Sequence, residues 1–202
     1  MRIKIIKTNF TYKQPLIPLD PNKVDTIFIH HPAAVTAMPE QIHQWHLEKG
    51  WNGFGYNEYI RKDGTVYIGR GDNVGAQMAN YNSKSYGICL EGNYDIEDAP
   101  SDELINIVAE RVVEAQKRLY KATNVLPHFA KFNTSCPGKN FPMLKLYKAI
   151  NKIKLNEDVI IVKDDRFEKL EQKVSDLDKK VTQLTEIMSI LDEKVTNRFK
   201  GL

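Results

Sequence analysis

The residues of this 202-residue chain best suited to bind a transition metal are five histidines and two cysteines. His30 and His31 close a predicted strand, while His128 and Cys136 lie far downstream in the loop-like segment LPHFAKFNTSCPG. Two imidazoles and one thiolate suit Zn²⁺, and three protein ligands leave the fourth position of a catalytic zinc to water. The spacing also allows a Cys–His nucleophilic pair in which Cys136 attacks a carbonyl, or residues with no shared role. Spacing alone does not decide between these interpretations.

The elements that must position these residues are typical of an α/β domain. Strands and helices alternate along the chain, so we expect a central mixed β-sheet flanked by helices. Asp63-Gly64 suits the tight turn of a hairpin, and Ser101 is a suitable N-cap for the longest helix of this region. The predicted strands are 24–29, 57–62, 65–69 and 85–91, and the predicted helices are 39–49, 101–122 and one within 140–154.

The composition narrows the class of protein. Hydrophobic residues make up 42% and charged residues 27% of the chain, which is typical of a folded protein. A net charge of +3 is too small to indicate nucleic-acid binding. No apolar run approaches the ~18 residues of a membrane span, and residues 1–16 lack the apolar core of a secretory signal. We therefore expect no membrane span, no signal peptide and, with only two cysteines, no disulfide scaffold.

The last part of the chain has a different composition and its own periodicity. Residues 1–155 contain every Trp, Pro, His and Cys, and the polar stretch 156–158 marks a linker before a tail, residues 160–202. β-branched residues at heptad position a with Leu at d favour a parallel two-stranded coiled coil, and Ile187 at a g position leaves a trimer as the alternative. An amphipathic helix packed on the first domain is a second alternative. The apolar heptad positions are Phe167, Leu170, Val174, Leu177, Val181, Leu184, Met188, Leu191 and Val195.

Four sequence blocks in order resemble one enzyme family. They are TIFIHHPA, QWHLEKGWNGFGYNEYIRKDGTVYIGR, NSKSYGICLEGN and PHFAKFNTSCPG. This chain is similar there to the zinc-dependent N-acetylmuramoyl-L-alanine amidases, the type 2 amidases of phage endolysins, bacterial autolysins and peptidoglycan recognition proteins. The resemblance covers roughly residues 24–150. It implies that 1–155 is a zinc amidase domain. The tail is not part of the family domain, and its heptad pattern alone predicts that 156–202 is a linker with a coiled-coil helix through which the chain forms a homo-oligomer, a dimer or a trimer.

The resemblance also implies a set of site residues. His30, His128 and Cys136 correspond to the family's zinc ligands, and Tyr56 to a tyrosine near its metal. Thr134 stands where some phage enzymes have Lys, so the donor to the developing negative charge is not assumed to be a cation. We expect Tyr56 or Thr134 to hold the oxyanion together with zinc, and Tyr56 is also the first candidate to steer the water proton.

A further departure from the family is Gln77, which stands where several relatives have a His. Gln77 can form hydrogen bonds but does not titrate near neutral pH. Together with Arg70, Asn80 and Asn82, it is a candidate for the substrate groove.

The implied activity is hydrolysis, by zinc-activated water, of the amide bond between N-acetylmuramic acid and L-alanine of the peptidoglycan stem peptide. The alternative function is a non-catalytic module that binds peptidoglycan and is oligomerised by its coiled coil. An endolysin of this kind would be made in the host cytoplasm without a signal peptide and would act at the cell wall after release.

Overall fold

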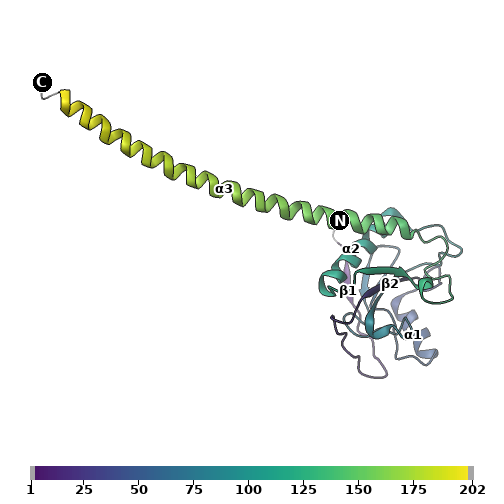
Figure 1. The fold of residues 1–202 in the computed structure, drawn as a ribbon. Coiled ribbons are helices and arrows are strands. Elements are labelled where there is room, and N and C mark those ends of the chain that lie inside the picture. The colour runs from purple at the N-terminus through teal and green to yellow at the C-terminus, as the bar shows by residue number, and fades with distance from the viewer. Residues whose placement is uncertain (1–2, 200–202) are drawn as a thin grey trace. The chain divides into compact units, whose positions relative to one another are not determined.

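Six strands form one mixed β-sheet in the order β1–β4–β3–β5–β2–β6 (Figure 1). The structure is a computed structural model that describes residues 3–199, without the side chains of 158–168, 171, 187 and 189–199. Among the described strands, β3 and β4 are the one antiparallel pair, and β2 pairs in parallel with both β5 and β6. The strands are β1 (Ile5–Lys7), β2 (Thr26–His30), β3 (Glu58–Ile60), β4 (Val66–Ile68), β5 (Ser85–Leu90) and β6 (Asn124–Pro127).

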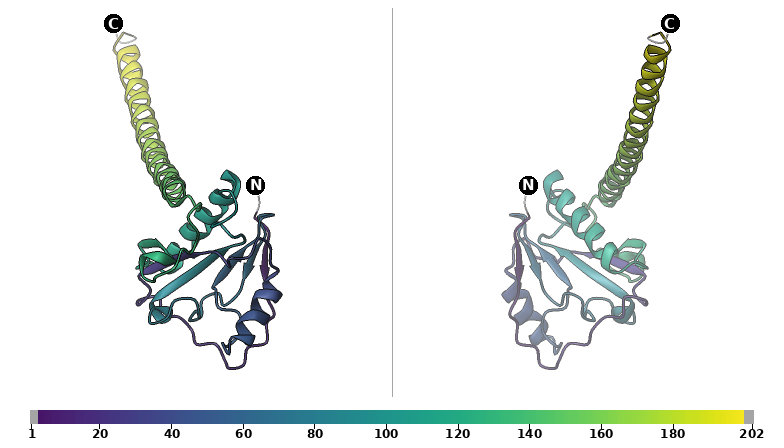
Figure 2. Two further views of the ribbon diagram at one scale, coloured as in Figure 1. Left: turned by 90° about the vertical axis from the view of Figure 1, so that its right-hand side faces the viewer. Right: turned by 90° about the vertical axis from the view of Figure 1, so that its left-hand side faces the viewer.

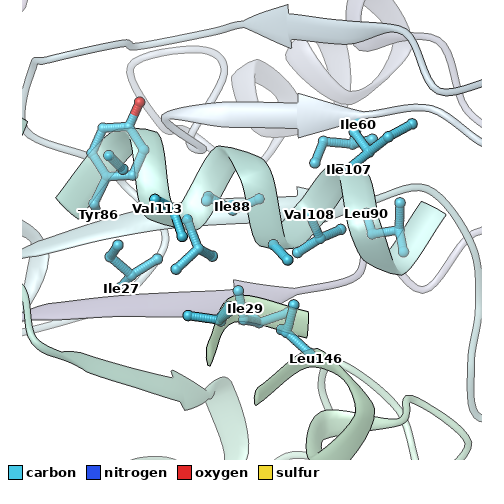
Figure 3. Packing of buried hydrophobic residues seen from close by; sticks show 14 of the residues in the cluster. Ile27, Ile29, Ile60, Tyr86, Ile88, Leu90, Ile107, Val108, Val113 and Leu146 are labelled. Atoms are coloured by element: carbon cyan, nitrogen blue, oxygen red, sulfur yellow. The ribbon is translucent and has the colours of Figure 1, made fainter. Parts of the chain in front are cut away.

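Helices cover both faces of the sheet, because successive side chains of a buried strand point to opposite faces. Ile27 and Ile29 of β2 belong to the larger core, under α2 (Asp102–Arg118) and the first turns of α3 (Met143–Phe199). Figure 3 shows this layer, in which Val108 of α2, Ile88 of β5, Ile29 of β2 and Leu146 of α3 belong to one cluster of buried side chains. The opposite face packs against α1 (Pro39–Glu48), which lies across the sheet from α2 (Figure 2).

The predicted mixed sheet flanked by helices is confirmed, with differences in single elements. Ser101 caps α2 as expected, since the Leu104 N–H donates to Ser101 Oγ at 3.2 Å. The helix ends at Arg118 rather than at 122, because the chain turns there through an Ala122 N–H bond to the Leu119 carbonyl. Strands β1 and β6 were not predicted. The second half of β6, Leu126 and Pro127, lies in the segment that we assigned to a loop.

The last helix continues through the stretch in which we expected a linker. Helix α3 runs from Met143 to Phe199, so residues 156–158 are helical. These residues are polar but include neither Gly nor Pro, and nothing in their backbone chemistry stops a helix. By internal contacts the chain divides into two units, with the boundary between Lys154 and Leu155. Within the described part, no helix is both long and apolar enough to cross a membrane.

A buried ion pair ties β3 to α2 on the larger core side. The Glu58 side chain is fully buried, and Arg111 donates to both of its oxygens, from Nε at 2.7 Å and from a terminal nitrogen at 2.8 Å. The Tyr86 hydroxyl donates to the same carboxylate at 2.8 Å. All of these groups depend on one another, because a buried charge is costly unless it is paired.

We expect Arg111→Met to lower the free energy of unfolding by about 3 kcal/mol, because it leaves the Glu58 carboxylate buried without its main partner. Urea denaturation measures this loss. The matched control is the double variant Glu58→Leu/Arg111→Met, which removes both charges and should recover part of the stability. An Arg111→Met protein as stable as the parent chain would contradict a structural role for the pair.

Candidate metal site

Two parallel strands bring His30 and His128 to the same edge of the sheet. His30 is the last residue of β2, and His128 directly follows β6. Ile29 is paired with Pro127 in the register of these strands, so the two histidines are the next residues on adjacent strands. Their ring centroids lie 4.7 Å apart. Because carboxyl ends of parallel neighbours meet at one edge, residues almost 100 positions apart in the chain meet there.

The loop after β6 returns Cys136 to this pair of histidines. The loop closes through a hydrogen bond from the Phe129 N–H to the Cys136 carbonyl at 3.0 Å. Cys136 Sγ lies 3.7 Å from His30 Nδ1, and one ligand atom from each of His30, His128 and Cys136 lies within 4.8 Å of the others. Tetrahedral zinc at ordinary bond lengths separates a sulfur ligand from a nitrogen ligand by about 3.6 Å. The three side chains therefore fit one zinc ion with little movement.

Burial sets the protonation of these groups. His30 is buried, and burial together with the neighbouring His128 lowers the pKa of its imidazole to about 3, so the ring is neutral with a free lone pair. Burial raises the pKa of the Cys136 thiol to about 12, and the backbone N–H of His31 donates to Sγ at 3.4 Å. Zinc binds the thiolate form of cysteine, so binding a metal here would release the thiol proton. The grouping of a second imidazole, His128, with His30 and Cys136 favours a metal site over a Cys–His nucleophilic pair, which uses one histidine.

Tyr56 lies beside the candidate ligands. Its ring is half-buried and has its centroid 5.4 Å from that of His30. Burial first, then the nearby thiols of Cys89 and Cys136, raise the pKa of the phenol well above its ordinary value. The group therefore keeps its proton and can donate a hydrogen bond.

Thr134 occupies the exposed part of the loop that carries Cys136. Its Oγ1 accepts a hydrogen bond from the Cys136 N–H at 3.2 Å. The bond helps to fix the loop next to the thiol, and it leaves the hydroxyl hydrogen of Thr134 able to donate elsewhere.

The residues predicted to line a substrate groove differ in their burial and in their hydrogen-bond partners. Arg70 is buried, and it donates to the carbonyls of Phe54 at 2.6 Å and Val74 at 2.8 Å, which is the arrangement of a structural residue rather than an exposed groove residue. Asn80 is exposed and has a positive φ of 63°. Asn82 Oδ1 accepts hydrogen bonds from the N–H groups of Gln77 and Met78, at 3.0 and 2.8 Å.

Gln77 is buried against a candidate ligand. Its Oε1 lies 2.5 Å from His30 Nε2. A groove residue would face solvent, whereas this side chain contacts the far side of the imidazole. No local pattern in the sequence indicates this contact, nor the role of Ser85, whose Oγ accepts from the Gln77 amide.

The other histidines bind backbone groups. His31 Nδ1 accepts from the Tyr94 N–H at 3.1 Å, and His46 Nδ1 accepts from the Gly55 N–H at 3.0 Å. His43 Nδ1 accepts a hydrogen bond from the Phe54 N–H at 3.0 Å. These bonds hold loops to the sheet and to α1, and within the described residues the grouping of potential metal ligands is His30, His128 and Cys136.

Comparisons with known proteins agree with this arrangement. Residues 20–139 match the family model described as N-acetylmuramoyl-L-alanine amidase, and the three candidate ligands lie within that range. The chain is 40% identical over 98 residues to an endolysin of Klebsiella phage KP32. The matched segment covers 46% of this chain and 60% of that protein. It is 37% identical over 128 residues to peptidoglycan-recognition protein LB of Drosophila melanogaster. That match covers 55% of this chain and 53% of that protein. The chain thus spans little more than half the length of these curated relatives.

A solved structure shows the same fold over the first unit. The N-acetylmuramoyl-L-alanine amidase LysC from Clostridium intestinale superposes with a TM-score of 0.67 at 31% sequence identity. The superposition covers 73% of this chain and 97% of LysC.

Proposed function

Because the chain belongs to the N-acetylmuramoyl-L-alanine amidase family, we propose that residues 1–155 form a zinc-dependent peptidoglycan hydrolase. The bond cleaved is the amide between N-acetylmuramic acid and L-alanine of the stem peptide. The observation that carries the proposal is the convergence of His30, His128 and Cys136 at one sheet edge, with ligand atoms within 4.8 Å of one another. Such a set leaves one tetrahedral position open, as catalytic zinc requires.

In the proposed mechanism the protein holds the metal and stabilises charge on the substrate. His30, His128 and Cys136 bind Zn²⁺, which when bound polarises a carbonyl and lowers the pKa of water. Tyr56, whose ring lies next to His30, donates a hydrogen bond to the oxyanion that forms on the scissile carbonyl. Thr134 is the second candidate donor, because its oxygen accepts from the Cys136 N–H and its hydroxyl hydrogen remains able to donate.

A second candidate function is recognition of peptidoglycan without cleavage. It is favoured by the similarity to a protein named as a peptidoglycan-recognition protein. The presence of Cys136 beside both histidines favours hydrolysis, because a module that only binds muropeptide has no need of an open metal position.

Mass analysis of purified peptidoglycan after digestion tests the proposed activity. We expect muramic acid with free lactyl ends together with stem peptides that begin at L-alanine, and we expect both products to disappear when a zinc chelator is added and to return with Zn²⁺. Peptidoglycan that binds the protein but stays uncut would support the recognition module instead. Cleavage at a glycosidic or peptide bond would contradict the proposed bond specificity.

The tail supports a proposal about assembly and location. The described apolar heptad residues from Leu170 to Met188 are between 51% and 64% exposed, which leaves an apolar stripe on a lone helix. Lys173 occupies a g position and Asp178 the following e position, so a parallel pair of tails brings these opposite charges together across the interface. We therefore propose a parallel homodimer through 160–202, with a trimer as the alternative, acting at the cell wall.

A further inference from the structure

Gln77 links a candidate metal ligand to the backbone through a chain of hydrogen bonds. Gln77 Oε1 lies 2.5 Å from His30 Nε2, and Gln77 Nε2 donates to Ser85 Oγ at 3.2 Å. Ser85 Oγ in turn lies 2.8 Å from the carbonyl oxygen of Tyr81. Both the glutamine and the serine are buried, so water does not compete for these bonds.

The backbone carbonyl at the end of this series of hydrogen bonds determines which atom carries the hydrogen in each of them. A backbone carbonyl can only accept, so the Ser85 hydroxyl must donate to Tyr81. Ser85 Oγ then accepts from the amide nitrogen of Gln77, which turns the amide oxygen toward the imidazole. The amide oxygen also only accepts, so His30 carries its hydrogen on Nε2.

The consequence is a free lone pair on the other ring nitrogen of His30. Nδ1 is the atom that lies 3.7 Å from Cys136 Sγ, on the side of the candidate ligands. We propose that Gln77 is a positioning residue that fixes the tautomer and ring orientation of His30, so that Nδ1 is ready to bind the metal before the metal arrives. This inference rests on the proposed zinc site.

Two neighbouring residues, Asn82 and Gly87, fix the position of Gln77. Asn82 Oδ1 accepts from the N–H groups of Gln77 and Met78, which fixes the backbone at that point of the loop. Gly87 of β5 faces the same side chain, and a Cβ atom there would lie 2.6 Å from Gln77 Cδ. Any larger residue at 87 would displace the amide, so the strand leaves space for this glutamine.

Two variants of Gln77 separate its acceptor role from its bulk. Gln77→Leu keeps the size and removes the acceptor, and we expect zinc affinity to fall by about 10–100-fold, as for other residues that orient metal ligands. Gln77→Glu keeps an oxygen acceptor opposite His30 Nε2 and should stay within a few-fold of the parent chain. Affinity is measured on the full chain by competition with a chromophoric zinc chelator.

The second readout is the ¹⁵N chemical shift of the His30 ring in the metal-free protein, which reports the tautomer directly. We expect the Nε2–H form in the parent chain and loss of its dominance in Gln77→Leu. Ser85→Ala removes the group that orients the amide and should mix the two tautomers, while the exposed Ser83→Ala is its matched control. The Ser85 variant keeps the proposal testable if Gln77→Leu fails to fold.

The inference is overturned if the metal-free parent chain shows the Nδ1–H form, or if Gln77→Leu binds zinc as tightly as the parent chain. Failure of the proposed zinc site gives a different result, namely a parent chain that binds no zinc although His30 is in the Nε2–H form. The tautomer measurement thus separates the two.

Discussion

The Cys136→Ser variant is expected to lose its zinc and all detectable peptidoglycan hydrolysis. A serine hydroxyl does not ionise near neutral pH, so one of three ligands becomes a poor donor, and the two histidines alone do not define a catalytic zinc site. The loss of metal affinity should exceed the ~100-fold upper range seen for residues outside the ligand set. Elemental analysis of the purified variant and release of soluble peptidoglycan fragments measure the two effects.

Two further variants make this result specific. Cys89→Ala removes the other thiol of the chain, which is buried outside the ligand group, and should retain zinc. Tyr56→Phe should retain zinc but lower turnover by about 10²–10³-fold, the usual effect of removing one donor to an oxyanion. A Cys136→Ser protein with full activity in the presence of a chelator would contradict the zinc mechanism.

The meeting of His30 and His128 was accessible from the sequence only through the resemblance to the amidases, because just one of the two strands that position them was predicted. The apolar run before His30 predicted a buried strand, and the resemblance to the amidases implied that His128 and Cys136 join it. The sheet supplies the physical reason: β2 and β6 are parallel neighbours, so their carboxyl ends meet. The strand β6 itself was missed because Pro127 and the polar residues after it are typical of a loop.

The edge strand β1 was missed for a related reason. Its three residues, Ile5–Lys7, are largely exposed and show neither a buried run nor a long alternation. Such a strand forms because β4 offers it a row of backbone partners, and a local sequence pattern carries little of that information. Short edge strands are therefore the elements for which a sequence predicts least.

The roles of Gln77 and Arg70 depend on contacts between distant segments. Both were candidates for a substrate groove, Gln77 because it stands where several relatives have a His and can form hydrogen bonds. In the fold, the loop at Gln77 lies over β5 and places the amide against His30, while Arg70 turns inward to the carbonyls of Phe54 and Val74. No spacing in the sequence distinguishes a buried glutamine that orients a ligand from an exposed one that contacts substrate.

For the tail, the heptad pattern of the sequence predicts an association between chains, which the structure of one chain does not test. Exposed Leu177 and Leu184 are expected to be buried when two tails associate. Replacing both with Ser should weaken association by about 10⁴-fold or more, because each Leu buried in a dimer contributes about 1.5–3 kcal/mol and each chain supplies two. Sedimentation of the full chain should therefore change from oligomer to monomer at micromolar concentration.

The matched control for this experiment replaces two residues of the same helix outside positions a and d. Ser175→Ala/Gln183→Ala leaves the heptad core intact and should sediment like the parent chain. The described part of the tail carries exposed apolar residues at a and d over several turns, whereas Phe167, Leu191 and Val195 lie outside the residues whose side chains are described. A parent chain that sediments as a monomer at high concentration would contradict self-association and favour the alternative in which the amphipathic helix packs on the first domain.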